Sequence, residues 1–305
     1  MMSKNYMILY VLLFLLLIGC KSEQDNTEAL INRSAEWFKN DDFPYNLKKP
    51  ALELKMPMVL KEISGLSYVE ETKQLAVIND ELGNVYLLNP ENAKIEEKIK
   101  FQRFGDYEAI EYVDGDYFVT NSKGDLRRIT PGKEVKMELL QTRLGYENNV
   151  EGMGYDEKAN VLFLACKDQA QLTGEDKKKG KAVYTFSLDE MKLNTDPLFV
   201  VKDNALLGWF ENNVGKVSKK IEDRISSFSP SAISLHPKTR LLYVTSARGD
   251  LLVVFDLNGN VKHIELVRDH MEQIEGVCFD KKGRLFISSE GVSKKGRVFA
   301  FNPLD

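Results

Sequence analysis

Five short segments of the chain follow one pattern at a nearly constant spacing, and this repeat limits the possible folds more than any other feature. In each segment a Ser or Glu is followed by Gly or Ala, a bulky apolar residue, a variable residue and a large apolar residue. The Ser or Glu positions are Ser64, Glu108, Glu151, Ser231 and Glu275. They are separated by 44, 43, 80 and 44 residues. A regular repeat of this length indicates similar units that share one continuous core.

Each repeated segment precedes two further strand-like runs, and the turns between these runs carry Gly, Asn and Asp. Short antiparallel strands that recur every ~44 residues predict an all-β chain, namely a β-propeller built of four-stranded blades. A β-sandwich is the competing architecture, but a sandwich does not predict one motif at a fixed spacing. The propeller is therefore the favoured fold.

The gap of 80 residues decides how many blades are predicted. Four strands can be assigned within it, the last of them at residues 198–202, which leaves a charged loop at residues 169–181 and a second insertion at residues 203–229. Apolar residues in the second insertion recur at intervals of three and four, which is typical of a helix. We therefore predict a five-bladed propeller with a helical insertion, and six blades are the alternative.

The two ends of the repeat region are expected to meet. Only 30 residues follow Glu275, which is enough for three strands but not for four. Residues 51–58 have an alternating pattern and no blade of their own. This N-terminal strand is expected to complete the last blade, which would close the ring and remove an open sheet edge.

The amino terminus is predicted to direct export. An unbroken apolar run at residues 8–18 is too short to span a ~30 Å membrane core but suits a signal peptide. The run ends in Leu17-Ile18-Gly19-Cys20, which resembles the bacterial lipobox. An ordinary signal peptide with a chance cysteine is the alternative.

A lipobox at this position defines the expected domain organisation. We expect residues 1–19 to be a lipoprotein signal peptide and Cys20 to be the lipidated residue. Residues 20–46 are expected to form a tether that could hold a short helix, and residues 47–305 to form the propeller. Acyl chains on Cys20 would anchor the exported protein to a membrane of the cell envelope, with the outer membrane favoured.

Composition excludes several classes of partner and site. The formal net charge is -4 and no basic stripe is present, which argues against a nucleic-acid partner. Three cysteines and three histidines are too few for a disulfide framework or a zinc cluster. A monomer is expected.

The predicted fold gathers the repeated Ser and Glu residues at one place. In a propeller blade the first strand lines the central channel, and the end of the second strand lies on the same face as the start of the first. Glu108, Glu151 and Glu275 are therefore expected around one mouth of the channel. Further contributors to this mouth are expected from strand starts and strand ends, namely Ser64, Asp80, Asn121, Asp168, Ser231 and Glu290.

Carboxylates that converge on a narrow axis repel one another unless they are protonated or bound to a cation. Oxygen ligands without His or Cys suit a hard ion, above all Ca²⁺, so Glu108, Glu151 and Glu275 are the predicted metal ligands. The bases nearest to them along the chain are Lys123, Lys167 and Arg248. Two alternatives are glutamates that only stabilise the channel, by capping backbone N–H groups or pairing with a base, and a catalytic acid pair.

The segments 62–68, 105–111, 149–153 and 274–277 resemble those of the SdiA-regulated (YjiK-like) proteins. The resemblance covers roughly residues 47–305 and implies a five-bladed propeller with a calcium site. It carries ligands over only to Glu108, Glu151 and Glu275, because Ser64 and Ser231 replace Glu in two blades. The resemblance implies no settled activity.

Two functions follow as expectations. The first is a lipid-anchored, calcium-binding module that recognises a small ligand or a protein of the cell envelope. The alternative is a calcium-dependent hydrolase, a phosphoesterase or lactonase, in which Glu151 or Glu275 at the channel mouth activates water. Propeller phytases and gluconolactonases share the topology, so the enzyme rests on analogy of fold.

Overall fold

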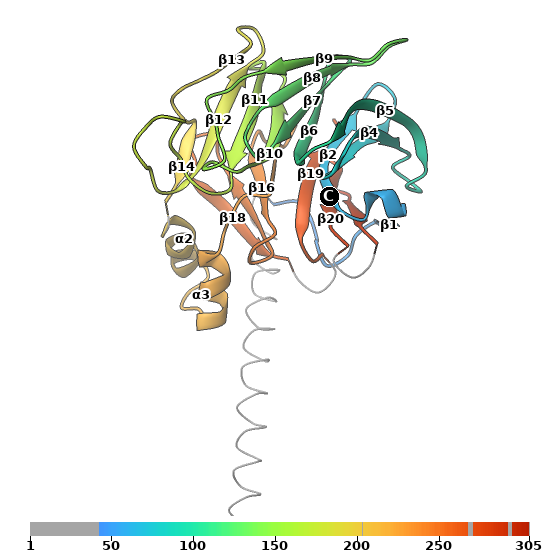
Figure 1. Cartoon of the computed structure of the whole chain (residues 1–305). Helices are drawn as coiled ribbons and strands as arrows, with labels where there is room; N and C mark the ends of the chain where they lie inside the picture. Colours follow the sequence, from blue (N-terminus) through green and yellow to red (C-terminus); the bar gives the residue numbers. More distant parts are fainter. Residues whose placement is uncertain (1–42, 203, 268–270, 292–294, 305) are drawn as a thin grey trace, which may run out of the picture. The chain divides into compact units, whose positions relative to one another are not determined.

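Five antiparallel sheets follow one another along the chain in the computed structural model, which describes residues 43–202, 204–267, 271–291 and 295–304 (Figure 1). They lie within a compact unit that runs from Pro44 to Asp305. The predicted signal peptide, Cys20 and the tether up to residue 42 lie outside the described residues. Within the described part of the chain, no helix has the length and apolar character needed to cross a membrane.

In each sheet the first three strands, counted from the inner strand outwards, follow one another along the chain. The inner strands are β2 (Ile63–Val69), β6 (Tyr107–Val113), β10 (Val150–Asp156), β15 (Ala232–Leu235) and β19 (Ile274–Phe279). The second strands are β3 (Gln74–Asn79), β7 (Asp116–Asn121), β11 (Val161–Cys166), β16 (Leu242–Ser246) and β20 (Leu285–Ser289). The third strands are β4 (Leu82–Leu88), β8 (Leu126–Thr130), β12 (Lys181–Ser187), β17 (Leu251–Phe255) and β21 (Arg297–Phe301).

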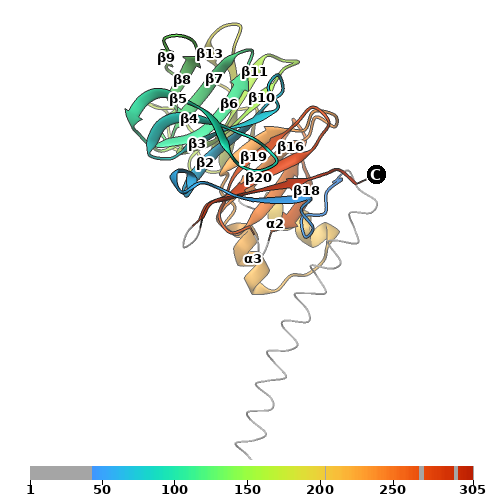
Figure 2. The ribbon, with the colours of Figure 1, turned by 90° about the vertical axis from the view of Figure 1, so that its right-hand side faces the viewer.

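The outer strands complete blades 1 to 5, numbered in the order of their inner strands. They are β5 (Ile95–Phe104), β9 (Lys136–Leu140), the pair β13 (Lys192–Leu193) and β14 (Phe199–Val201), β18 (Val261–Leu266) and β1 (Leu52–Lys55). The inner strands contact one another in the order β2, β6, β10, β15, β19 and back to β2. Both views show β19 and β20 beside β2 (Figures 1 and 2). The prediction of a five-bladed propeller is confirmed, and the alternative of six blades is excluded.

The hydrophobic core lies between neighbouring blades. One cluster joins Ile78 and Val85 of blade 1 to Ile110 and Val119 of blade 2, and similar clusters join blades 2 and 3 and blades 5 and 1. Every residue of the strands β7, β16 and β17 is buried, because each sheet is covered on both faces. The strand β9 at an outer edge is exposed at four of its five positions. These second and third strands of their blades are therefore buried, whereas this strand at an outer edge is largely exposed.

The ring closes as predicted, through a strand from the amino-terminal side. β1 pairs antiparallel with β21, with Leu52 opposite Ala300 and Leu54 opposite Val298. Leu54 and the following Met56 are 6% and 0% exposed, and both belong to the core between blades 5 and 1. A short 3-10 helix, η1 (Met58–Leu60), then leads into β2.

The long gap in the repeat holds the helical insertion. Helices α2 (Ala205–Asn213) and α3 (Lys219–Ser226) lie within the segment predicted to be helical. They contact each other, and α2 contacts β18 (Figure 1). Blade 3 departs from the sequence prediction in one respect, because its outer edge is divided. A single strand was expected at residues 198–202, whereas β13 and β14 both pair with β12.

The small residue after each repeated Ser or Glu is explained by the close approach of inner strands. A Cβ atom added at Gly65 would lie 2.9 Å from the backbone N of Ile110 and 3.1 Å from the backbone C of Ala109. Both atoms belong to the neighbouring inner strand β6, whose backbone cannot move aside without disturbing blade 2. Gly65 therefore sets the spacing between blades 1 and 2.

We expect Gly65→Ala to lower the free energy of unfolding by about 1–3 kcal/mol, because the added methyl group overpacks this contact. The measurement is urea unfolding followed by tryptophan fluorescence. Gly208→Ala in α2 is the matched control, because no described atom lies within 4 Å of its added Cβ. Alanine favours a helix over glycine, so the control should gain up to ~1 kcal/mol. Equal stability of the two variants would contradict the steric role of Gly65.

Candidate functional site at the channel mouth

The repeated Ser or Glu lies at a β-bulge in four of the five blades. The pairing of inner and second strands shifts register between Ile63 and Gly65, and in the same way around Glu108, Glu151 and Glu275. A bulge leaves the extra residue outside the regular ladder and changes the direction of its side chain. Ser231 differs, because it directly precedes β15. The local backbone therefore presents three glutamates at the amino ends of their inner strands.

The three glutamates lie close enough to influence one another electrostatically. Burial, followed by the charges of Glu151 and Asp106, raises the pKa of Glu108 to about 8. Burial, followed by the charge of Glu151, raises the pKa of Glu275 to about 8. At neutral pH the Glu108 and Glu275 carboxyls are thus mostly protonated, in keeping with carboxyls confined to a poorly solvated space.

Glu151 differs from its two neighbours because a base reaches it. The Lys167 ammonium donates to Glu151 Oε1 at 2.5 Å, and the Asn149 amide donates to the same oxygen at 3.1 Å. Burial raises the pKa of Glu151, but Lys167 opposes the shift. The ammonium also lowers the pKa of Glu108 and Glu275, so it lies near all three carboxyls. Lys167 follows the second strand of blade 3 and supplies positive charge to the mouth.

Ser64 and Ser231 connect neighbouring blades at the same end of the channel. The Ser64 hydroxyl donates to the carbonyl oxygen of Tyr107 at 2.7 Å, and the Ser231 hydroxyl donates to that of Ile274 at 2.6 Å. These acceptors directly precede Glu108 and Glu275 in the sequence. Each serine therefore fixes the backbone beside a glutamate of the next blade, a role that its sequence position alone did not indicate.

Asp80 and Glu290 form a second acidic region with Glu62. Burial, followed by the charges of Glu62, Glu81 and Glu290, raises the pKa of Asp80 to about 6. Burial and the charge of Glu62 also raise the pKa of Glu290. Asp80 Oδ1 is buried and has no hydrogen-bond partner among the described residues. These acids extend the region of repelling carboxyls towards blades 1 and 5.

The remaining two predicted contributors have local partners. Asn121 Oδ1 accepts a hydrogen bond from the backbone N–H of Asp125 at 3.0 Å, so its side chain organises the turn between β7 and β8. Asp168 lies 4.0 Å from the Lys181 ammonium and lines an open cavity of about 470 Å³ together with Tyr146. Among the described residues, neither side chain forms a hydrogen bond or ion pair with the three central glutamates, although the charge of Asp168 raises the pKa of Glu151.

The donor chemistry of the mouth can be compared with the needs of a metal ion. Carboxylate oxygens suit Ca²⁺, which takes six to eight oxygen ligands at about 2.3–2.6 Å. As they are placed, however, no three His, Cys, Asp or Glu side chains of the described residues are grouped so that they could hold a metal ion. Lys167 is bonded to Glu151 where a cation would be expected. The carboxylate oxygens are of the type that calcium binds, but in their present positions Glu151 forms an ion pair with Lys167 and the three carboxyls are not grouped as metal ligands.

Fold and site together define the protein as a five-bladed propeller with bulged glutamates at one mouth of its channel. The chain belongs to the SdiA-regulated family, whose model matches residues 41–130 and 194–292. No curated protein matches the sequence.

Several solved structures resemble the propeller. A luciferin-regenerating enzyme has a TM-score of 0.52 at 10% identity, over 84% of this chain and 96% of that chain. Glutaminyl cyclase from Myxococcus xanthus has a TM-score of 0.55 at 13% identity, over 84% and 97%. A gluconolactonase from Xanthomonas campestris has a TM-score of 0.48 at 9% identity, over 79% and 72%. The first two structures share the propeller fold with this chain. Sequence identities this low support no statement about its activity or its ligand.

Proposed function

We propose that the protein is a lipid-anchored binding module of the cell envelope, and that the mouth formed by Glu108, Glu151 and Glu275 takes up Ca²⁺ as part of ligand binding. The observation that supports this proposal most is the burial of three mutually repelling carboxyls beside one lysine. Such a group gains stability from added positive charge, whether protons or a cation supply it. The lipid anchor rests on the apolar run that ends at Cys20.

Calcium would compete with two other sources of positive charge. Protons on Glu108 and Glu275 must leave before these groups can act as anionic ligands, so calcium affinity should rise with pH. The Lys167 ammonium must also leave Glu151. The bound partner is proposed to be a small ligand or an envelope protein that approaches this face of the propeller.

We expect millimolar Ca²⁺ to raise the melting temperature of a chain that starts at Lys21, measured at pH 8 against the same sample in chelator. A site that binds only the folded state gains about 2.7 kcal/mol when the free ion is at ~100 times its Kd. Glu151→Gln should reduce the effect, because it removes one of the three carboxyl ligands. Lys167→Met should increase calcium affinity, because it removes the competing ammonium group.

Lys262→Met is the matched control for the lysine substitution. Lys262 pairs with Asp256 at 3.3 Å in blade 4, away from the mouth. This variant should respond to Ca²⁺ as the unmodified protein does. Absence of any calcium response in both the unmodified chain and Lys167→Met would overturn the calcium proposal.

A calcium-dependent hydrolase is the second candidate, and the unequal ionisation of the mouth favours it. The pKa of Glu108 and of Glu275 is raised to about 8, whereas the ammonium of Lys167, 2.5 Å from Glu151, opposes the rise in the pKa of that carboxyl; carboxyls with separated pKa values would provide an acid and a base side by side. Two similar propellers are named as enzymes, which supports catalysis by analogy of fold only. Chelator-sensitive turnover of generic phosphoesters or lactones, lost in Glu151→Gln, would favour the hydrolase over the binding module.

A further inference from the structure

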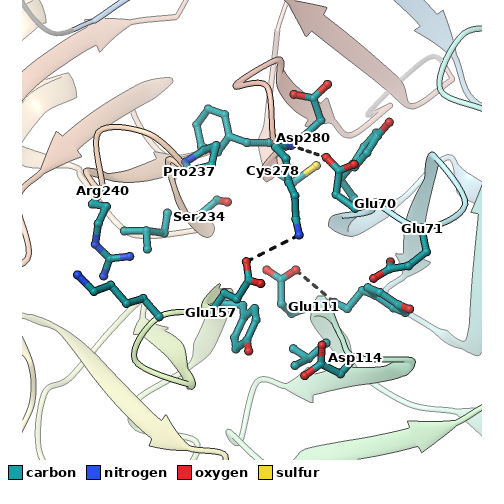
Figure 3. Close-up of a pocket in the computed structure, with 18 residues that line it drawn as sticks. Glu70, Glu71, Glu111, Asp114, Glu157, Ser234, Pro237, Arg240, Cys278 and Asp280 are labelled. Atoms are coloured by element: carbon teal, nitrogen blue, oxygen red, sulfur yellow. Dashed lines mark hydrogen bonds and ion pairs between the residues drawn. The ribbon is translucent and has the colours of Figure 1, made fainter.

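The other end of the channel holds a cavity of about 480 Å³ that the proposed function does not use. Its lining comes from the carboxyl ends of all five inner strands and the turns that follow them (Figure 3). Glu70, Asp114, Glu157, Pro237 and Asp280 represent the five blades in this ring. The cavity is therefore separated from Glu108 and its neighbours by the length of the inner strands.

Glu111 points into the middle of this cavity (Figure 3). It lies three residues after Glu108 on the same strand, β6. Its Oε1 accepts hydrogen bonds from the Ser67 hydroxyl of blade 1 and from the backbone N–H of Tyr112, the latter at 3.2 Å. Among the described residues no hydrogen bond reaches Oε2, so this oxygen can accept a bond from a ligand. Burial raises the pKa of Glu111 to about 7.

The charge around Glu111 is predominantly negative. Six acidic side chains line the cavity, namely Glu70, Glu71, Glu111, Asp114, Glu157 and Asp280, against the three bases Lys158, Arg240 and Lys281. Two of these bases already have acidic partners. The Arg240 guanidinium binds both carboxylate oxygens of the buried Asp156, at 2.5 and 3.0 Å, and the Lys281 ammonium lies 3.9 Å from Glu157. A cationic ligand would be attracted to this cavity and an anion repelled.

Three tyrosines add aromatic surface to the acidic lining. Tyr68, Tyr112 and Tyr155 border the cavity on blades 1, 2 and 3. Tyr68 is stacked on Phe286 with ring centroids 5.5 Å apart, and Tyr112 packs against Tyr117 at 5.2 Å. These ring contacts hold two of the tyrosines in place. Aromatic faces attract organic cations and also cover the aliphatic part of such a ligand.

We infer that this cavity binds a small organic ammonium ion, with Glu111 Oε2 accepting a hydrogen bond from the ligand's N–H group. The inference combines a partly open cavity of suitable size, a half-buried carboxylate with one oxygen available, a surplus of acids and three tyrosines in the lining. A metal ion fits this cavity less well, because the described residues contain no group of three acidic, His or Cys side chains placed as ligands. The site is independent of calcium uptake at the other mouth.

The test is titration calorimetry of the chain that starts at Lys21, at pH 8 and about 0.15 M salt, where exposed charges are screened beyond about 8 Å. The diamine cadaverine is the probe, and tetramethylammonium and the dianion glutarate are its comparisons. We expect saturable binding of one cadaverine, at least tenfold weaker binding of tetramethylammonium, which has no N–H group, and no binding of glutarate. Equal binding of tetramethylammonium would overturn the assigned role of Glu111.

Substitutions of residues that line the cavity test whether cadaverine binds there. Glu111→Gln should weaken cadaverine at least tenfold, and Asp114→Asn at the exposed rim should weaken it by a smaller factor. Glu138→Gln, on the exposed outer strand β9, is the matched control and should leave binding unchanged. Glu151→Gln should also leave it unchanged, which separates this cavity from the calcium proposal. No saturable binding to the unmodified chain, or unaltered binding in both Glu111→Gln and Asp114→Asn, would overturn the inference.

Discussion

A chain that starts at Pro57 should fail to form a stable propeller, although it retains all but one strand of the five blades. The deletion removes β1, which supplies the outer edge of blade 5, together with the buried Leu54 and Met56. Loss of a buried Leu or Met side chain costs about 2–5 kcal/mol, and a domain is stable by only about 5–15 kcal/mol. The deletion also exposes β21, whose Val298–Phe301 segment is fully buried, as an unpaired edge. We expect the cooperative thermal transition to disappear and aggregates to form.

Circular dichroism during heating and size-exclusion chromatography measure this result. Lys55→Ala is the matched control, because Lys55 is an exposed residue of β1 and the pairing of its backbone with Arg297 does not need the side chain. It should melt within a few degrees of the unmodified protein. A synthetic peptide of residues 44–56 should partly restore folding when added to the shortened chain. A monomeric, cooperatively melting chain from Pro57 would show that the ring does not need this strand.

The closure of the propeller ring by β1 illustrates how much of the fold could be predicted from the sequence. The repeat located the inner strands, and the count of residues after Glu275 left one strand missing from the last blade. Residues 51–58 carried an alternating pattern, so both the strand and its place could be predicted. Local patterns suffice here, because strand alternation and Gly, Asn or Asp turns depend on residues close in sequence. The helical insertion was predicted for the same reason, from the spacing of its apolar residues.

The details of the channel mouth were harder to predict. Sequence spacing indicated that Glu108, Glu151 and Glu275 share one end of the channel, but it did not indicate the bulges that carry them. A bulge depends on how the inner strand pairs with the second strand. The bonds from Ser64 and Ser231 to the next blade likewise depend on the distance between blades. Lys167 was recognisable as a nearby base, whereas its bond to Glu151 depends on side-chain direction.

Glu111 shows a different limit of sequence analysis. It belongs to the same repeated segment as Glu108, but the variable position that it occupies holds Ser67, Gly154, Ser234 and Cys278 in the other blades. A residue type that occurs once in five repeats gives no pattern. Only the ring of inner strands shows that Glu111 meets Ser67 within a cavity lined by acidic side chains from four blades.

The carboxyls of the channel mouth should make the protein less stable as the pH rises from about 4.5 to 8. The folded pKa of Glu108 and of Glu275 is about 8, whereas the ordinary value is 4.5. Between these values the folded chain binds more protons than the unfolded chain, so the free energy of unfolding falls as pH rises. The stabilising effect of the protons is fully present below about pH 4.5 and is lost above about pH 8.

Replacement of both groups should remove this dependence, because glutamine keeps the shape of a protonated glutamate and cannot ionise. We expect the Glu108→Gln, Glu275→Gln double variant to match the unmodified protein near pH 4.5 and to exceed its stability at pH 8 by a few kcal/mol. For a domain of this size each kcal/mol corresponds to about 2–4 °C in melting temperature. The measurement is a series of thermal melts across this pH range.

The difference in stability between the unmodified protein and the double variant separates the titration of Glu108 and Glu275 from that of all other groups. Burial also raises the pKa of Glu265 to about 8 and lowers that of His236 to about 4, and both groups are present in each protein. The exposed substitution Glu138→Gln should leave the pH profile unchanged. At pH 8, Ca²⁺ should stabilise the unmodified protein and have little effect on the double variant. If the stability difference stays flat across the range, the two carboxyls titrate as solvated groups, and the repulsion that supports cation uptake at this mouth is absent.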